Sequence, residues 1–304
     1  MMELLQDSHY VACGAHRLHL RQIGPTLVSQ AEPVLMVHGA IENGRIFYTE
    51  SGKGLACFLA RHGYQVYVAD LRGRGQSEPS IAKVQDHGQH ELITEDLPTL
   101  QAWIAARHPG HKVHWVAHSW GGVLMASTLV RFPDLAAGIA SLLFFGSKRG
   151  VSVQSPERWL KVDLIWNRLA PWLARRQGFL AARKLKIGAD DEPLRYLEET
   201  IPWVKCGPWQ DPYDGFAYDE AAERVPWPPL WLISAKADRV LGHPEDVHRF
   251  GAELGVRARP RHTRLGRDRG NRLDYDHINM LTAPQAIDDH FPEILRWLSH
   301  PAAS

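Results

Sequence analysis

Short hydrophobic runs alternate with longer stretches of mixed polarity through the first half of the chain. Four of these runs are rich in β-branched or aromatic residues and end at turn-forming residues: 33–38, 65–70, 112–118 and 139–145. Uninterrupted apolar runs of this length, bounded by turns, are typical of strands buried in a parallel sheet. The stretches between the runs, for example 93–107 and 123–132, are helical in character. This alternation predicts an α/β fold in which a mostly parallel sheet carries helices on both faces.

The pattern changes in the middle of the chain, where a long segment shows no strand pattern. This segment is helical in character, rich in tryptophan and interrupted by proline and glycine. A further strand is predicted at 229–234, and the last helix at 284–298. We therefore predict a core formed by residues 1–147 and 226–304, with residues 148–225 inserted as a helical subdomain.

The overall composition is ordinary for a globular protein and excludes several classes of partner. Of the 304 residues, 44% are hydrophobic and 23% are charged, and the net charge is +1, so nothing favours binding to nucleic acid. Three cysteines far apart, Cys13, Cys57 and Cys206, do not form a disulfide framework and suit a reducing compartment. No apolar run is long enough to be an integral membrane segment, and the first ten residues do not resemble a signal peptide. These features predict a cytoplasmic protein.

Ser119 has the sequence context of a nucleophile held at a sharp turn. It follows the strand predicted at 112–118 and precedes a predicted helix, an arrangement that lifts a serine hydroxyl above the carboxyl edge of a sheet. Small residues are needed two positions before and after it, because strand and helix crowd together there. Gly121 meets this need fully, and Ala117 adds one methyl group to the more usual glycine.

A serine hydroxyl needs a base to accept its proton, and histidine is the usual choice because its pKa lies near neutrality. His277 is the histidine whose position fits, because it lies in a loop after the last predicted strand and before the final helix. Loops at the carboxyl ends of strands converge over the same edge of a sheet. Three other candidates lie within a strand, or in or beyond the final helix, out of easy reach of the serine: His262, His290 and His300.

The imidazole in turn needs an acceptor that fixes its tautomer. Asp238 follows the strand predicted at 229–234 and is therefore expected at the correct edge of the sheet. The other common position for this acceptor, after the run at 139–145, offers Ser147, Lys148 and Arg149 but no carboxylate. The sequence therefore predicts a group of three residues in the chain order Ser119, Asp238, His277.

An oxyanion that forms during attack by this serine requires two preorganised N–H donors. The backbone N–H of Trp120, directly after the nucleophile, is the first predicted donor. The second is expected in the loop after the run at 33–38, where Gly39 permits a sharp turn. We predict that the Ala40 N–H is this donor, with the Ile41 N–H as the alternative.

Taken together, these motifs resemble the α/β-hydrolase family. The resemblance covers residues 33–297 apart from the insert, and it is carried by five features in order: His38-Gly39, the segment 70–77 (Asp-Leu-Arg-Gly-Arg-Gly-Gln-Ser), Ser119, Asp238 and His277. The segment 95–98 (Glu-Asp-Leu-Pro) is similar to lipase- and lysophospholipase-like members. The resemblance implies that the insert is a cap over the active site, which shapes the acyl or alcohol pocket.

The resulting hypothesis is a serine hydrolase that cleaves carboxylic esters with an apolar acyl part through an acyl-enzyme. The substrate is expected to be a small ester, with lipid-like esters such as a monoacylglycerol or a lysophospholipid among the candidates, and no cofactor is required. Ile41, Trp159 and Trp166 are predicted to contact the substrate, since aromatic and apolar side chains suit an acyl chain. Two alternatives stay open: another reaction of the same family, namely C–C bond or thioester hydrolysis or acyl transfer, and a non-catalytic binding protein.

No metal site is expected. His87 and His90, beside Asp86 and Glu91, are interpreted as a solvated loop, because no further ligands stand at a recognised spacing.

Overall fold

A single large sheet organises the molecule in a computed structural model that describes residues 4–24, 32–255 and 257–301. Within these residues the sheet has eight strands in the order β1-β2-β4-β3-β5-β6-β9-β10. Their bounds are β1 Leu5–Cys13, β2 His16–Gly24, β3 Pro33–Val37, β4 Gln65–Asp70, β5 Val113–His118, β6 Ile139–Phe145, β9 Leu230–Ala235 and β10 Arg261–Leu265. The six strands from β4 to β10 in this order are parallel, whereas β1 and β2 are antiparallel additions at one edge. The prediction of a mostly parallel sheet is confirmed.

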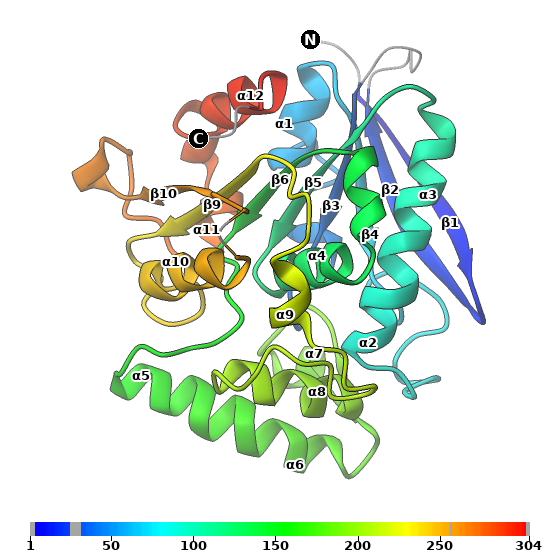
Figure 1. The fold of residues 1–304 in the computed structure, drawn as a ribbon, viewed down its shortest axis with the longest axis vertical. Coiled ribbons are helices and arrows are strands. Elements are labelled where there is room, and N and C mark those ends of the chain that lie inside the picture. The colour runs from blue at the N-terminus through cyan, green and yellow to red at the C-terminus, as the bar shows by residue number, and fades with distance from the viewer. Residues whose placement is uncertain (1–3, 25–31, 256, 302–304) are drawn as a thin grey trace.

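The strands predicted from hydrophobic runs are buried along their whole length. Every residue of β3, β4, β5 and β9 is buried, because helices cover both faces of the sheet. These strands therefore do not alternate between buried and exposed residues. One layer of core packs α3, α4 and α10 on one face, and a second packs α1, α11 and α12 on the other. The predicted helices on both faces are therefore confirmed (Figure 1).

The helices of the described residues are mostly short. The α-helices are α1 Leu55–Arg61, α2 Gln89–Glu91, α3 Leu97–Arg107, α4 Trp120–Arg131, α5 Pro156–Arg158, α6 Ala170–Ala174, α7 Ala182–Leu185, α8 Leu194–Val204, α9 Tyr218–Ala222, α10 Pro244–Glu253, α11 Asn279–Thr282 and α12 Phe291–Ser299. Wider π-helical turns occupy Leu92–Asp96 and Trp159–Leu169, and 3₁₀ turns occupy Gly44–Ile46, Pro133–Gly138, Arg267–Arg269 and Pro284–Asp288. None of these helices has both the length and the apolar character that crossing a membrane requires.

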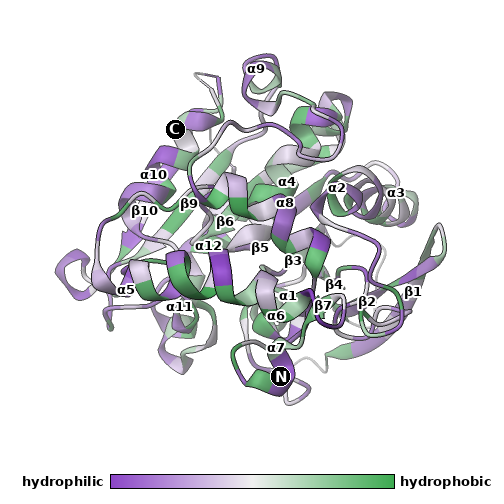
Figure 2. Ribbon diagram, turned by 90° about the horizontal axis from the view of Figure 1, so that it is seen from below, coloured by the Kyte–Doolittle hydropathy of each residue, from purple (hydrophilic) through white to green (hydrophobic). Residues whose placement is uncertain are grey.

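The segment between β6 and β9 lies below the sheet in Figure 1, away from the two ends of the chain. It begins with a helical stretch from α5 to α6, and hydrophobic and hydrophilic residues alternate along this stretch (Figure 2). The segment is not wholly helical, because Phe179–Leu180 (β7) pairs with Glu192–Pro193 (β8). Its later part shares the main core, since Trp203, Trp209 and Tyr218 belong to the same buried cluster as α4. The division of the chain at residues 148 and 225 stays a prediction.

Two further differences from the sequence-based expectation concern the ends of the chain. The hairpin β1–β2 was not predicted, because β1 is largely exposed and its mixture of polar and apolar residues gives no buried run. The final helix predicted at 284–298 is broken into a 3₁₀ turn at Pro284–Asp288 and α12. The break coincides with Asp289, whose carboxylate accepts from the Arg272 N–H at 2.8 Å and from the Tyr275 hydroxyl at 2.9 Å.

Candidate active site

The turn between β5 and α4 places Ser119 in a strained conformation at the carboxyl edge of the sheet. Its φ of 52° and ψ of −123° lie in a region that residues with a side chain rarely adopt. The turn is held because the Ser119 N–H donates to the Phe145 carbonyl at 2.7 Å. Gly121 is required by close packing, since a Cβ there would lie 2.6 Å from the carbonyl oxygens of Val37 and His38.

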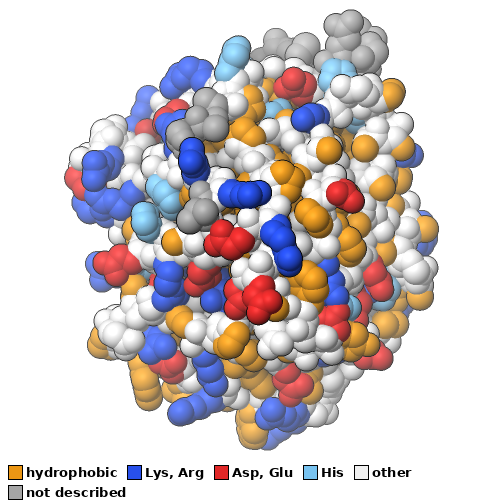
Figure 3. Space-filling model, in the orientation of Figure 1, with side chains coloured by type: hydrophobic (Ala, Val, Ile, Leu, Met, Phe, Trp, Pro, Cys, Tyr) orange, Lys and Arg blue, Asp and Glu red, His pale blue; other side chains and the backbone are white. Residues whose placement is uncertain are grey.

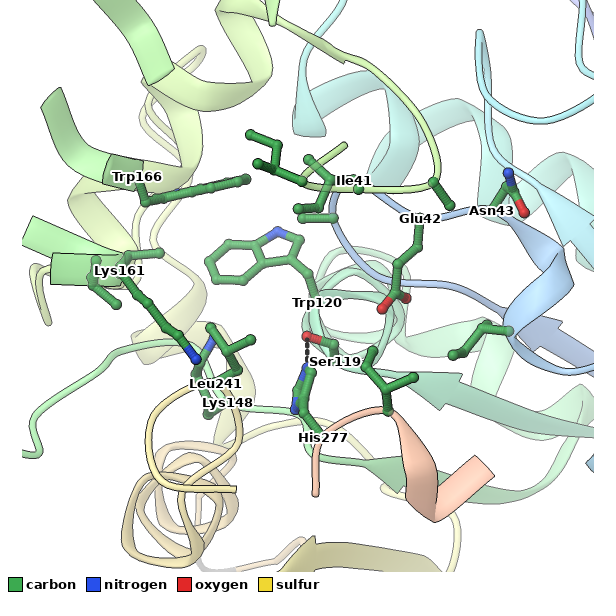
Figure 4. A pocket seen from close by; sticks show the side chains of 18 of the residues that line it. Ile41, Glu42, Asn43, Ser119, Trp120, Lys148, Lys161, Trp166, Leu241 and His277 are labelled. Atoms are coloured by element: carbon green, nitrogen blue, oxygen red, sulfur yellow. Dashed lines mark hydrogen bonds between the residues drawn. The ribbon is translucent and has the colours of Figure 1, made fainter. Parts of the chain in front are cut away.

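Loops after two other strands bring a histidine and an aspartate to this turn. His277 Nε2 lies 2.9 Å from Ser119 Oγ, and His277 Nδ1 lies 2.5 Å from Asp238 Oδ2. A carboxylate only accepts, so Nδ1 carries the proton in this contact, and the neutral ring presents Nε2 as an acceptor to the serine hydroxyl. The structure therefore brings together the three side chains predicted to act as one group. Figure 4 shows the contact between Ser119 and His277.

The electrostatics of this group keep the histidine available as a base. Burial lowers the pKa of the His277 imidazole, and although Asp238 opposes this shift, the net change is downward. Burial by itself would raise the pKa of Asp238, but the His277 ring outweighs it, and the net shift of that pKa is also downward. The arrangement thus combines an ionised aspartate with a histidine that is neutral near pH 7.

The two predicted oxyanion donors lie beside Ser119 and have no acceptor. Ala40 and Trp120 both line the cavity in front of the serine, and neither backbone N–H donates to any residue in the described part of the chain. The alternative donor, the Ile41 N–H, is already occupied, because it donates to Glu192 Oε1 at 2.6 Å. Of the Ala40 and Ile41 N–H groups, therefore, only that of Ala40 has no acceptor among the described residues.

A second histidine, His118, lies directly under the His277 ring. The two ring centroids are 4.6 Å apart. His118 Nδ1 lies 2.8 Å from Glu42 Oε2, and His118 Nε2 lies 2.8 Å from the His277 carbonyl oxygen. The same Glu42 oxygen accepts from the Gly39 N–H at 2.8 Å, so this glutamate joins the loop after β3 to the residue before the serine.

The cavity above Ser119 has a volume of about 520 Å³ and extends between the sheet edge and the insert. Two of the three residues predicted to contact substrate, Ile41 and Trp166, line it (Figure 4). The third does not, because Trp159 begins the π-helical stretch on its outward side and is 56% exposed. The rest of the lining is largely aliphatic, with Val151, Val162, Ile187, Val204 and Leu241 among it.

Comparison with known proteins identifies the family. A family model described as the alpha/beta hydrolase fold matches residues 32–186, just over half of the chain. The chain belongs to the α/β-hydrolase family.

Solved structures with this fold cover nearly all of this α/β-hydrolase chain at low sequence identity. A soluble variant of monoglyceride lipase from Saccharomyces cerevisiae is 14% identical with a TM-score of 0.68, covering 98% of this chain and 97% of that one. Carboxylesterase CesB from Bacillus subtilis is 15% identical with a TM-score of 0.60, covering 98% and 93%. The thioesterase domain from the curacin biosynthetic pathway is 14% identical with a TM-score of 0.57, covering 97% and 99%. At these identities the likeness establishes the fold alone.

In this α/β-hydrolase Glu192 of the insert forms a buried ion pair with Arg74 of the segment after β4, and it also accepts a hydrogen bond from the loop that contains Ala40 and Ile41. The Glu192 carboxylate, wholly buried, pairs with the equally buried guanidinium of Arg74. Glu192 accepts from the Ile41 N–H. In the same part of the insert, the N–H groups of Ala189 and Asp190 donate to the Ile41 carbonyl at 2.8 and 3.1 Å. Ile41 itself has a φ of 52°, so the clamp holds a strained residue beside the cavity.

The region predicted as a solvated loop around His87 and His90 is more structured than expected. His87 is buried, because its ring packs 5.5 Å from that of His16, and burial lowers its pKa to about 2. His90 forms a possible ligand group with Asp211 and Asp214, whose ligand atoms lie within 4.8 Å of one another. Arg131, however, forms ion pairs with both of these carboxylates. The guanidinium therefore occupies the place where a cation would bind.

Several residues of the site were not found from the sequence. The contacts of Glu42, His118 and Glu192 join segments far apart in the chain, and Lys148 becomes part of the cavity lining only in the folded chain, so no spacing rule signals these four residues. One local signal for two of them exists in the sequence, because they stand next to motifs that were recognised. Glu42 follows His38-Gly39 closely, and His118 directly precedes Ser119.

Proposed function

We propose that the protein is a carboxylic-ester hydrolase in which Ser119 is the nucleophile, His277 the general base and Asp238 the residue that orients the base. The observation that carries this proposal is the unbroken line of hydrogen bonds from the serine hydroxyl through both nitrogens of His277 to Asp238. Such a line increases the basicity of the ring as the serine loses its proton.

In the proposed reaction, Ser119 Oγ attacks the ester carbonyl and its proton passes to His277 Nε2. The developing oxyanion accepts from the N–H groups of Ala40 and Trp120, which are free for it. His277 then donates its proton to the leaving alcohol oxygen, and the acyl group stays on the serine. Water, deprotonated by the same histidine, attacks the acyl-enzyme and releases the acid.

The aliphatic lining of the cavity supports an apolar acyl part for the substrate. Among solved structures with this fold, one is a monoglyceride lipase and another is a carboxylesterase, which is consistent with this class. A thioesterase domain is also among them, so thioester hydrolysis belongs in the first substrate screen.

The proposal is tested with Ser119→Ala and with Ser80→Ala as a matched control at an exposed serine. The Ser119 variant should lose labelling by a fluorophosphonate probe, and kcat for p-nitrophenyl esters should fall by on the order of 10⁴-fold or more. The control should label and hydrolyse as the unchanged protein does. Persistent labelling of the Ser119 variant contradicts the assignment, and a folded protein that never labels favours a non-catalytic binding protein. Activity confined to thioesters or to diketones points to the alternative reactions.

A further inference from the structure

Lys148 places an amino group without a counter-ion in the wall of the active-site cavity. It follows β6 and lines the same cavity as Ser119 and His277, with 7% of its surface exposed. Its amino group makes no hydrogen bond or ion pair with any residue that the structure describes. Its one close partner is the Trp120 ring, whose centroid lies 5.7 Å from Nζ. A buried ammonium normally has a partner, because removing it from water without one is costly.

The nearest carboxylates are already engaged elsewhere. Asp238 accepts from His277, and Asp246 accepts from the N–H and hydroxyl of Ser152 at 2.9 and 2.6 Å and pairs with Arg249. Burial lowers the pKa of the Lys148 ammonium, and the two aspartates oppose this only in part. A negative group entering the cavity would supply the direct ion-pair partner that Lys148 lacks among the described residues.

The other lysine, arginine and glutamate side chains of the lining already have ion-pair partners. Lys161 pairs with Glu157 at 2.7 Å, and Arg45 pairs with Glu50 at 2.5 Å. Glu42, the one carboxylate among the described lining residues, is held by His118. Figure 4 shows Lys148 and Lys161 extending toward one another on the side of the cavity near Leu241. Two ammonium groups thus lie on this side of a largely aliphatic cavity, and of the two only Lys148 lacks an ion-pair partner among the described residues.

We propose that this wall is an anion subsite, in which Lys148 binds a carboxylate or phosphate carried by the substrate while Lys161 adds positive charge at the rim. This deepens the proposed ester hydrolysis and rests on it. It assigns a mixed substrate: an apolar chain along the aliphatic lining, an ester at Ser119 and an anionic group at Lys148.

The experiment compares two matched pairs of esters. The first is mono-p-nitrophenyl adipate against p-nitrophenyl hexanoate, which differ by a terminal carboxylate on the acyl side. The second is 1-lauroylglycerol 3-phosphate against 1-lauroylglycerol, which differ by a phosphate on the alcohol side. For each pair the ratio of kcat/KM, anionic over neutral, is measured. Lys148→Met should lower this ratio about 10- to 100-fold for the pair whose anion reaches the subsite, as expected for loss of a charged hydrogen bond.

The pair that responds identifies the source of the anion. A response of the adipate pair places the carboxylate on the acyl side, and a response of the glycerol pair places a phosphate on the alcohol side. Lys184→Met is the matched control, because Lys184 is exposed on the insert and does not line the cavity. It removes the same charge and should leave both ratios within about twofold of their original values.

Failure of this proposal is distinguishable from failure of the proposed hydrolysis. If the neutral esters are hydrolysed but Lys148→Met changes neither ratio by more than about twofold, the anion subsite is wrong and the hydrolase stands. If no ester is hydrolysed, binding is measured directly from melting temperatures in adipate and in inorganic phosphate. Either anion should then stabilise the unchanged protein more than Lys148→Met, and equal shifts overturn the subsite. The variant should fold, because it removes a buried charge that has no partner.

Discussion

The surroundings of His118 favour its positively charged form, because both of its ring nitrogens face oxygen atoms. The His277 carbonyl oxygen can only accept, so His118 Nε2 bears a proton. Burial by itself would raise the pKa of Glu42, yet His118 outweighs it and lowers that pKa to about 2, so the carboxylate is ionised and Nδ1 also bears a proton. Burial opposes the charged form of His118, but Glu42 prevails and raises its pKa. The two acceptors and the raised pKa together favour the imidazolium form of His118.

This charge affects His277, the proposed general base. A cation packed against the His277 ring disfavours protonation of that ring and contributes to the lowered pKa of His277. Because His277 must be neutral to accept the serine proton, the acid limb of the kcat/KM profile should lie below pH 6.5, the ordinary value for histidine.

His118→Gln should move this acid limb to higher pH. The substitution removes the neighbouring cation and leaves the Glu42 carboxylate, and both changes favour the protonated form of His277. The measurement is kcat/KM for p-nitrophenyl hexanoate as a function of pH, with His111→Gln as control, since His111 is exposed. A limb that stays in place, or moves to lower pH, means that His118 does not set the charge balance of the base.

At the scale of elements, the site depends on how closely α4 approaches β3 behind the nucleophile. Gly121 lies in the first turn of α4, and its missing Cβ makes room for two backbone carbonyls of the neighbouring chain segment. Backbone atoms of a central strand cannot move aside as the end of a flexible side chain can, so an added methyl group must shift the helix itself.

Gly121→Ala should therefore reduce the free energy of unfolding by about 1–3 kcal/mol and lower kcat, because the Trp120 N–H moves with the helix. Gly138→Ala is the control, since its added Cβ would meet only the flexible Gln101 side chain at 3.4 Å. Its effect should stay within about 0.5 kcal/mol. Urea unfolding measures both variants, and equal stability of the two contradicts the packing argument.

The elements that the sequence predicted well are those whose pattern has a single physical cause. The strands at 33–37 and 65–70 are confirmed because burial on both faces leaves a continuous apolar run. The positions of Ser119, Asp238 and His277 followed from the rule that loops after parallel strands meet at one edge, and the three side chains do meet there. Edge strands such as β1 have no comparable signature.

The sequence did not predict the side-chain contacts that surround Ser119, Asp238 and His277. Glu42 and His118 are 76 residues apart, and Arg74 and Glu192 are 118 apart. Neither pair has a spacing that a helix or strand would impose, so only the folded chain reveals them. The sequence could not show for the same reason that Trp159 lies outside the cavity lining, because the side of the insert that faces the cavity depends on how its helices pack.

At the scale of the whole molecule, charge is distributed too evenly to guide a substrate from a distance. The net charge is +1, and Figure 3 shows acidic and basic side chains intermingled over the face it presents. Recognition of an anionic group would therefore be local to the cavity, where burial strengthens each charge, and should depend only weakly on ionic strength.

The Arg74–Glu192 ion pair joins the insert to the core, and Glu192 also accepts from the Ile41 N–H. Removing one member of a buried pair leaves the other charge without compensation, which is more costly than removing both. Glu192→Gln should therefore lower the free energy of unfolding by roughly 3 kcal/mol. It should also lower kcat, because the loop at Ile41 is held less firmly once the ion pair is lost. The glutamine side chain still offers an acceptor to the Ile41 N–H, so this hydrogen bond can remain.

The double variant Arg74→Met with Glu192→Gln provides the decisive comparison. It contains no uncompensated charge, and Arg74→Met keeps apolar contact with Tyr196, over whose ring the guanidinium lies at 4.8 Å. The double variant should be more stable than Glu192→Gln alone, with a coupling of at least about 1 kcal/mol in the cycle. If stability recovers while kcat stays low, the charge pair itself holds the Ala40–Ile41 loop in its active geometry. If the two substitutions are simply additive, the pair does not join the insert to the core, and the position of the proposed oxyanion loop depends on the backbone hydrogen bonds from Ala189 and Asp190 to the Ile41 carbonyl.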